Sequence, residues 1–297
     1  MLQFVIDLLI RASDIVLVAV GLSVVYSLVR FPNVAHVQYA MTGAFVTLGM
    51  TRAGVTFAAA LAVSCVATGC LAVALNVFVF RRLLRSGSSI AMVGSLAVSM
   101  ILIAVVLGTA GSRPLRYRTA LSTPLQVGST MISVDQITSI ACGFGCVALL
   151  ALLLFKTGVG RSMRAMASNP ALAAATGVDG ARVLNGISFL SGALAALGGT
   201  MLGLTENVHV DLGTNLLLPV FAAAIVGGLG NPLGAAAGAV LIALAETLAT
   251  NIDFGWMVGR SGVYLPVSYV GAASFVILLA ALLLRPYGLF DREVRRV

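Results

Sequence analysis

Apolar sequence is interrupted at two places by polar side chains. These side chains could line a path for a small solute. The first break is Phe31–Tyr39, which contains Asn33, His36 and Gln38. The second is Gly227-Gly-Leu-Gly-Asn-Pro-Leu-Gly234, whose candidate path residues are Gly227, Gly228 and Asn231. Non-helical backbone at membrane depth needs hydrogen-bond partners for its N–H and C=O groups, either from protein or from a water-filled cavity. Paired breaks in the two halves of a chain therefore point to a permeation path. We therefore predict one or two discontinuous helices here, with ordinary turns between spans as the alternative.

One carboxylate lies inside an apolar run. Glu246 lies within Ala243–Ala249, and an ionised side chain there would cost about 3 kcal/mol if it faced lipid. It must therefore face protein, water or a partner helix, either in a hydrogen-bonded helix contact or on the solute path. Asp14 follows Arg11 by three residues, a spacing that allows a pair on one helix face at the membrane edge.

A basic, glycine-punctuated segment separates two long apolar runs. Arg161 and Arg164 precede Asn169, which can cap a helix that opens with Pro170, and Gly177 can end that helix in a left-handed turn. A membrane protein that keeps such a loop in the cytosol usually presents it to a soluble partner. The alternative is a surface helix whose arginines bind anionic lipid.

Patterns typical of enzymes and metal sites are missing. The one lysine, Lys156, follows Phe155 in an apolar run, not the glycine that a phosphate-binding loop requires. Nucleophile elbows and His-Glu-x-x-His sites are also missing, and neither His36 nor His209 has a ligand at metal-binding spacing. We expect no catalytic site, cofactor or metal in this chain.

The composition is that of an all-α polytopic membrane protein. Of the 297 residues, 60% are hydrophobic and 9% charged, and the mean hydropathy is +1.07. At about 20 residues a span, this length accommodates roughly eight to ten transmembrane helices. No flexible linker is visible, so residues 1–297 are predicted to form a single membrane domain. The expected spans are about 8–29, 36–50, 54–80, 90–109, 136–155, 184–205, 213–228, 233–250 and 264–284.

We interpret the net charge of +8 as a sign of how the chain is oriented in the membrane, and not of nucleic-acid binding. By the positive-inside rule, cations in loops mark the cytosolic side, which then includes the C-terminus. The segment 111–135 is expected to form an extracytoplasmic cap, although it carries Arg113, Arg116 and Arg118. The cations assigned to the cytosol are Arg30, Arg81, Arg82, Arg85, Lys156, Arg161, Arg164, Arg182, Arg285, Arg292, Arg295 and Arg296.

Several of these segments together resemble a known family. They are Phe31–His36, Gly43–Phe45, Arg161–Pro170 with Ala175–Val178, Ser191–Gly199, Gly227–Gly234 and Arg285–Phe290. In this order, over nearly the whole chain, they resemble the permease family of branched-chain amino-acid ABC importers, of the LivH type.

The resemblance implies a multi-pass subunit of an importer in the bacterial inner membrane, in contact with membrane lipid. Its partners would be two cytosolic ATP-binding subunits, which hold ATP and Mg²⁺, a second homologous permease or second copy, and a periplasmic solute-binding protein. The loop of about 156–183, with Arg161, Arg164, Asn169, Pro170 and Gly177, would contain the helix that couples the chain to the ATPase.

The solute is left open by a departure from the family pattern. Val37-Gln38 follows His36, where the family commonly has Gly-Glu. The family handles branched-chain amino acids, urea, short amides and aromatic acids. An ion-coupled secondary transporter of small solutes is the alternative, and it predicts internal repeats and several acidic groups near the midplane. A purely structural subunit would have no polar helix breaks.

Overall fold

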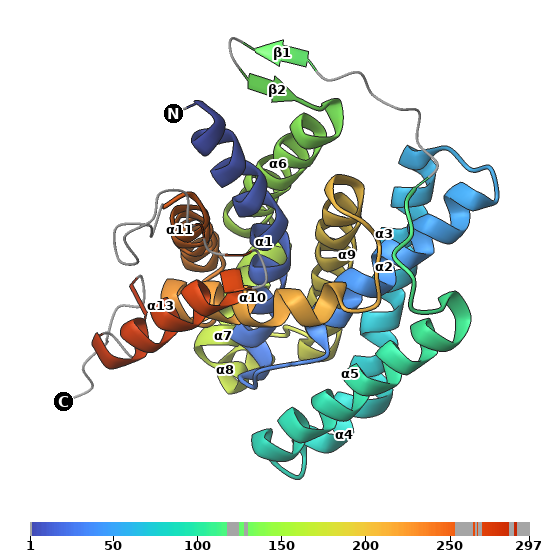
Figure 1. Ribbon diagram of the computed structural model, residues 1–297. Coiled ribbons are helices and arrows are strands. Elements are labelled where there is room, and N and C mark those ends of the chain that lie inside the picture. Colours follow the sequence, from blue (N-terminus) through green and yellow to red (C-terminus); the bar gives the residue numbers. More distant parts are fainter. Residues whose placement is uncertain are drawn as a thin grey trace.

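The computed structural model describes residues 2–117, 125–127, 130–252, 264, 266, 269–284 and 288–289. These residues form helices joined by short connections, with one small hairpin (Figure 1). The first half contains α1 (Leu2–Val29), α2 (His36–Arg52), α3 (Phe57–Leu75), η1 (Asn76–Phe80), α4 (Arg81–Leu84) and α5 (Ser88–Ala110). The second half contains α6 (Val134–Lys156), α7 (Gly158–Ser168), α8 (Pro170–Ala175), α9 (Gly180–Thr205), α10 (Leu212–Gly227), α11 (Pro232–Asn251) and α13 (Val270–Leu284).

Apolar runs produced helices in each expected span. Six helical stretches of the described residues are long and apolar enough to cross a membrane, and α10 and α13 are shorter apolar helices. The expectation of an all-α polytopic protein is therefore confirmed. The expected cap contains a hairpin of β1 (Leu125–Val127) and β2 (Thr130–Ile132), in which Gln126 pairs with Met131.

The buried centre is built on α1 and α9. Helix α1 packs against α6, α9, α10 and α11, and α9 also packs against α2 and α3 (Figure 1). Gly43 of α2 contacts Ala196 of α9 so closely that a Cβ on Gly43 would meet the Ala196 backbone. In lipid, helices associate through close packing of small residues, since the tails are as apolar as the side chains.

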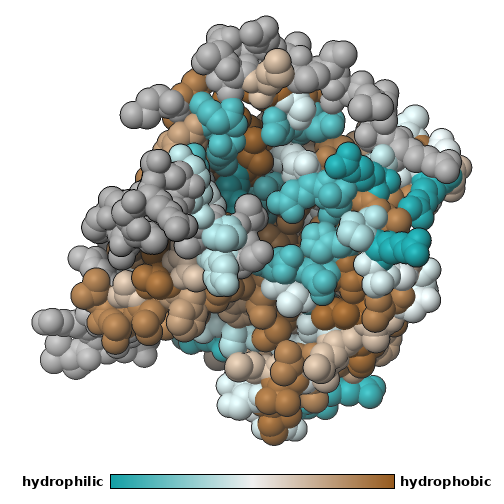
Figure 2. Space-filling model, in the orientation of Figure 1, coloured by the Kyte–Doolittle hydropathy of each residue, from teal (hydrophilic) through white to brown (hydrophobic). Residues whose placement is uncertain are grey.

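Hydrophobic side chains remain on the outer helices. Exposed residues on α5 include Val93, Met100, Ile101 and Val105, and α13 exposes Val276 and Leu283. Figure 2 shows hydrophobic residues over much of the lower part of the visible face and most of the hydrophilic residues gathered above them. This distribution suits contact with lipid or with another membrane subunit.

The two ends of the helix assembly differ in charge. Helix α6, about 35 Å long, begins directly after the hairpin and ends directly before α7, so these elements mark opposite ends (Figure 1). Arg30 Nη2 donates to the Ala167 carbonyl at 3.0 Å, and Arg81 Nη2 donates to the Ala181 carbonyl at 3.0 Å. The cations assigned to the cytosol, as far as the structure describes them, therefore cluster at the α7–α8 end. Arg285, Arg292, Arg295 and Arg296 lie outside the described residues.

Both polar breaks separate helices. At the first, α1 ends at Val29, Arg30 adopts a left-handed φ of 52°, and α2 begins at His36. At the second, α10 ends at Gly227 and α11 begins at Pro232. Gly228 and Gly230 have φ of 99° and 91°, a conformation that glycine adopts without steric cost. Gly230 lies against Ser27 near the end of α1. The second break is thus a turn at the α7–α8 end, which is the alternative kept open above.

Candidate functional site

A wide polar pocket lies between α1, α9, α10, α11 and α13. Its volume is about 580 Å³, within the range of small-molecule sites. Its described lining residues are Asp7, Arg11, Glu206, Asn215, Pro219, Glu246, Thr247, Thr250, Asn251, Val270 and Gly271. Glu246 is the one residue of the predicted path that lines it.

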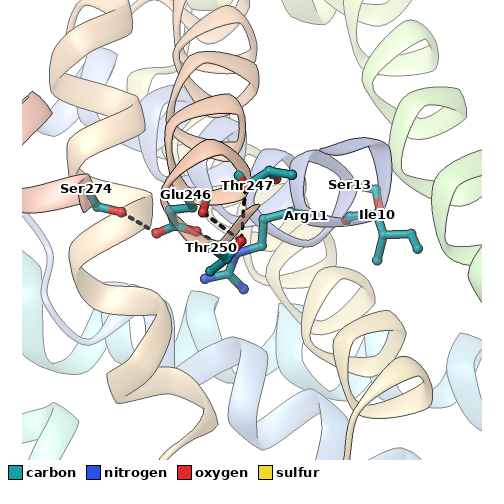
Figure 3. A network of polar contacts seen from close by, with 7 residues as sticks. All are labelled: Ile10, Arg11, Ser13, Glu246, Thr247, Thr250 and Ser274. Atoms are coloured by element: carbon teal, nitrogen blue, oxygen red, sulfur yellow. Dashed lines mark hydrogen bonds and ion pairs between the residues drawn. The ribbon is translucent and has the colours of Figure 1, made fainter. Parts of the chain in front are cut away.

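An ion pair holds Glu246 on the pocket wall. Arg11 Nε lies 2.5 Å from Glu246 Oε2, and the Ser274 hydroxyl donates to Glu246 Oε1 (Figure 3). Glu246 is 1% exposed, whereas the Arg11 side chain is 27% exposed. A buried carboxylate is tolerated when it is paired and hydrogen-bonded, and both Glu246 oxygens meet that condition. The contact joins α1 to α11 and α13.

The sequence prediction missed this partner. It paired Arg11 with Asp14 on the same helix, whereas the ion pair of Arg11 is to Glu246, 235 residues away. Asp14 is buried, and its Oδ1 has no hydrogen-bond partner in the described part of the chain. Arg11 is the one basic residue in its apolar span, and Glu246 is the one acidic residue in its own. Because an unpaired charge in a membrane span is costly, these two could have been predicted to pair.

The pocket opens at the hairpin end of the assembly. Glu206 follows the end of α9, which starts at the α7–α8 end. Asn251 ends α11, which starts at the turn containing Gly230, and Asp7 lies in the second turn of α1. Pro219 lies inside the continuous helix α10 and has no N–H for the carbonyl of Asn215, four residues earlier. Both residues line the pocket, so the Asn215 carbonyl lacks its usual helix donor on the pocket side of α10.

The first polar break lies apart from this pocket. Asn33, His36 and Gln38 are 6%, 1% and 2% exposed. Asn33 Oδ1 accepts from Ala35 N at 3.1 Å, and Ser95 Oγ accepts from Val34 N at 3.0 Å. Protein side chains therefore satisfy two backbone N–H groups of this break, those of Val34 and Ala35. Asn33 and His36 adjoin a cavity of only about 20 Å³, room for about one water.

His36 and Gln38 bind different neighbours. His36 Nε2 lies 3.1 Å from the Val18 carbonyl, and Nδ1 lies 3.2 Å from the Ser191 hydroxyl. Gln38 Nε2 donates to Thr214 Oγ1 at 3.4 Å, and Gln38 lies against Gly213 of α10. The structure therefore does not bring Asn33, His36 and Gln38 together with Glu246. Their role in the path stays a prediction.

Gly227, Gly228 and Asn231 belong to the α10–α11 turn. Asn231 Oδ1 accepts from Gly234 N at 3.1 Å and caps α11. A Cβ on Gly227 would meet the Gly234 backbone. These residues position α11, and through it Glu246, at the opposite end of the helix.

The basic segment forms the helix pair α7–α8. Asn169 Oδ1 accepts from Leu172 N at 3.1 Å, Pro170 opens α8, and Gly177 has a φ of 86°. These local features confirm the predicted cap, start and stop of α8. Asp179 then caps α9 by accepting from Ala181 N at 3.0 Å.

The two arginines of α7 have different environments. Arg164 lies over the Phe155 ring at 5.6 Å and donates to the Leu154 carbonyl, so it fixes the turn from α6 to α7. Arg161 and Arg164 are both exposed, as are Asn169, Pro170 and Gly177. Leu172 is 62% exposed on α8. The pair therefore offers a mixed polar and apolar surface at the cation-rich end.

Comparisons with known proteins agree with this architecture. The family model described as "Branched-chain amino acid transport system / permease component" matches residues 4–284. A probable branched-chain amino acid transport permease protein LivH of Methanocaldococcus jannaschii is 30% identical, over 95% of this chain and 90% of that protein. The high-affinity branched-chain amino acid transport system permease protein LivH of Escherichia coli K12 is 26% identical, over 96% and 94%. BraD of Pseudomonas aeruginosa, a permease protein with the same description, is 25% identical, over 100% and 98%.

The fold also resembles a solved structure. A chain of PsaBC from Streptococcus pneumoniae, solved in complex with a Fab, superposes with a TM-score of 0.54 at 13% identity, covering 96% of this chain and 92% of that one. Identity this low supports a shared fold alone. The family match spans nearly the whole sequence and includes both the polar pocket and α7–α8, so the chain belongs to the family of permease components of branched-chain amino acid transport systems.

Proposed function

We propose that this permease moves branched-chain amino acids, or a related small polar solute such as urea, a short amide or an aromatic acid, across the bacterial inner membrane as part of an ABC importer. The observation that carries the proposal is the family match over residues 4–284. The relatives named as branched-chain amino acid permeases support the solute class.

ATP hydrolysis is assigned to partner subunits. The chain's single lysine is not placed for a phosphate-binding loop. We infer two cytosolic ATP-binding subunits, which supply ATP and Mg²⁺, and a second homologous permease or a second copy of this chain. A periplasmic solute-binding protein would deliver the solute.

The helix pair α7–α8 is the proposed docking surface for an ATPase. It lies at the cation-rich end, which the positive-inside rule assigns to the cytosol. Arg161, Asn169, Pro170 and Gly177 are exposed there. Arg164 is also exposed there, and its contacts to Leu154 and Phe155 fix the start of α7. Lipid-facing helices such as α5 would surround the pathway on the outside.

The cytosolic assignment extends to the C-terminus. Leu289 N donates to the Val226 carbonyl at 2.8 Å, and Gly288 lies against Gly228. The last described residues therefore return to the α10–α11 turn, at the same end as α7–α8. This contact supports a cytosolic C-terminus.

Uptake by the reconstituted importer tests the proposal. Proteoliposomes containing both permeases and the ATPases, with binding protein outside and Mg²⁺-ATP inside, should accumulate radiolabelled L-leucine. A non-hydrolysable ATP analogue is the matched control and should abolish accumulation. Competition by unlabelled valine, urea, acetamide and benzoate then ranks the solute classes. Accumulation driven by an ion gradient, without ATPases, would instead establish the secondary-transporter alternative.

A further inference from the structure

The guanidinium of Arg11 is only partly used by its ion pair. A guanidinium has five N–H donors in a planar fork. Nε is directed to Glu246, whose other oxygen accepts from Ser274. No hydrogen bond joins Nη1 or Nη2 to another of the described residues, and the side chain is 27% exposed on the pocket wall. Glu246 therefore fixes the orientation of a fork whose outer N–H groups make no hydrogen bond to the part of the chain that the structure describes.

Two further carboxylates line the same pocket. Asp7 is partly buried, and its Oδ1 accepts from Gln3 Nε2 at 2.7 Å. Glu206 is exposed at the end of α9 and lies within electrostatic range of Arg11. Since Arg11 and Glu246 neutralise one another, Asp7 and Glu206 leave the charged lining residues with a net charge of −2. This balance disfavours a simple anion and favours a ligand that carries an ammonium group.

The remaining wall is partly apolar. Pro219 and Val270 line the pocket beside Asn215, Thr247 and Thr250. A ligand with a negative group, a positive group and an aliphatic part would therefore find a complementary surface for each part: Arg11, the two carboxylates and the apolar wall, respectively. Small-molecule sites of about 300–1,000 Å³ combine an apolar wall with a few placed polar groups in this way.

We propose that this pocket is a binding site for an α-amino acid zwitterion within the permease itself. The outer N–H groups of Arg11 bind the α-carboxylate, because a guanidinium fork matches a carboxylate in bidentate geometry. Asp7 and Glu206 attract the α-ammonium group, and the side chain lies toward Pro219 and Val270. The inference rests on the proposed function, in which an amino acid reaches the hairpin end of the chain from a binding protein.

Equilibrium binding to the assembled importer tests the site. The two permeases and ATPases are placed in lipid nanodiscs without the solute-binding protein, and binding of radiolabelled L-leucine is measured. Two competitors each lack one charged group: 3-methylbutylamine has no carboxylate and 4-methylpentanoate has no ammonium. We expect saturable leucine binding, with each competitor at least about tenfold weaker than leucine, because each loses one charged contact.

Variants assign that binding to named groups. Arg11→Lys retains the charge opposite Glu246 but removes the fork, and should weaken leucine binding about tenfold or more. The double variant Asp7→Asn, Glu206→Gln removes the two negative charges and keeps the Arg11–Glu246 pair. It should weaken leucine binding, whereas 4-methylpentanoate, an anion, should compete as well as before or better. Arg52→Lys, at the exposed last residue of α2, is the matched control and should bind as the unaltered importer does.

The outcomes separate this site from the proposed function. The site is overturned if the assembled importer does not bind leucine, or if both pocket variants bind it as the unaltered importer does. Either result would overturn the site even if ATP-driven leucine uptake is observed. If 3-methylbutylamine competes as well as leucine, the pocket binds amines and the zwitterion assignment is wrong. A failure of ATP-driven uptake for every solute of the family would instead refute the proposed function, whatever binds in the pocket.

Discussion

The His36 ring and the Ser191 hydroxyl meet at 3.2 Å in the buried contact between α2 and α9. Ser191 Oγ also donates to the Gly21 carbonyl at 2.9 Å, and His36 Nε2 lies 3.1 Å from the Val18 carbonyl. Because Nε2 faces a carbonyl oxygen, it must carry a proton. The two side chains thus connect three helices, α1, α2 and α9, at the first polar break.

Removing the Ser191 hydroxyl should destabilise this junction. Ser191→Ala leaves the Gly21 carbonyl without its hydroxyl donor and removes the hydroxyl beside His36 Nδ1, which should cost about 1–3 kcal/mol. The thermal unfolding temperature of the detergent-purified chain should fall. Ser89→Ala, at an exposed position of α5, is the control and should leave the temperature unchanged. Equal unfolding temperatures for the two variants would show that the junction carries little stability.

The crossing of α2 and α9 depends on glycine at one position of α2. Gly43→Ala places a methyl group against Ala196, and overpacking of this kind typically costs about 1–3 kcal/mol. Gly49→Ala, two turns later on the same helix, meets nothing within 4 Å and should be neutral or slightly stabilising. Thermal unfolding of both variants checks this, and destabilisation by Gly49→Ala would contradict the packing described.

The left-handed conformation of Gly177 should be required for coupling. Gly177→Val has open space within 4 Å but must adopt a φ of 86°, at a cost of about 1–2 kcal/mol. We expect reduced ATP-driven uptake at normal membrane insertion. Gly177→Asn should be milder, because Asn tolerates this conformation.

A helical glycine supplies the control for Gly177. Gly186→Val, in α9, meets nothing within 4 Å and has no left-handed φ, so its uptake should remain near normal. Normal uptake by Gly177→Val at equal expression would count against a coupling role for this turn.

Arg161 and Arg164 should have separable effects. Arg164→Ala removes the contacts to the Leu154 carbonyl and the Phe155 ring, and should lower the unfolding temperature of the chain alone. Arg161→Ala should leave that temperature unchanged and weaken binding of the ATPase, measured by co-purification. If Arg161→Ala destabilises the isolated chain while Arg164→Ala does not, the assignment of the two roles is reversed.

Thiol labelling distinguishes the polar pocket from the first polar break. In a background without Cys65, Cys70, Cys142 and Cys146, a cysteine at Asn215 or Thr250 should react with a small hydrophilic thiol reagent. A cysteine at His36 should react at least about tenfold more slowly, because its site adjoins only a water-sized cavity. Rates are compared by mass spectrometry in the state without nucleotide. Equal rates at His36 and Thr250 would place the first break on an open path.

Spans and local caps were predictable from the sequence. The helices follow from apolar runs long enough to cross a bilayer. The ends of α8 follow from Asn169, Pro170 and Gly177, because capping depends on residues a few positions apart.

Features that depend on distant segments were not predictable. The Arg11–Glu246 pair joins residues in the first and penultimate described helices, so no local pattern reveals it. His36 lies in an apolar run interrupted by polar residues, yet Val18 and Ser191 satisfy it internally. The π-helical turn Asn76–Phe80, near the end of the helical stretch 57–84, also has no marker in the sequence.

The 235-residue separation of Arg11 and Glu246 also has a consequence for biosynthesis. At about 5–20 residues per second, the ribosome takes roughly 10–50 s to reach Glu246 after Arg11 has been made. Helix α1 therefore enters the bilayer before its counter-ion exists. Arg11 lies in the third turn of α1, near enough to the helix end for its long side chain to reach the interface during that interval. The ion pair can form only after α11 has entered the bilayer, so the contact that fixes α1 to α11 and α13 comes late in insertion.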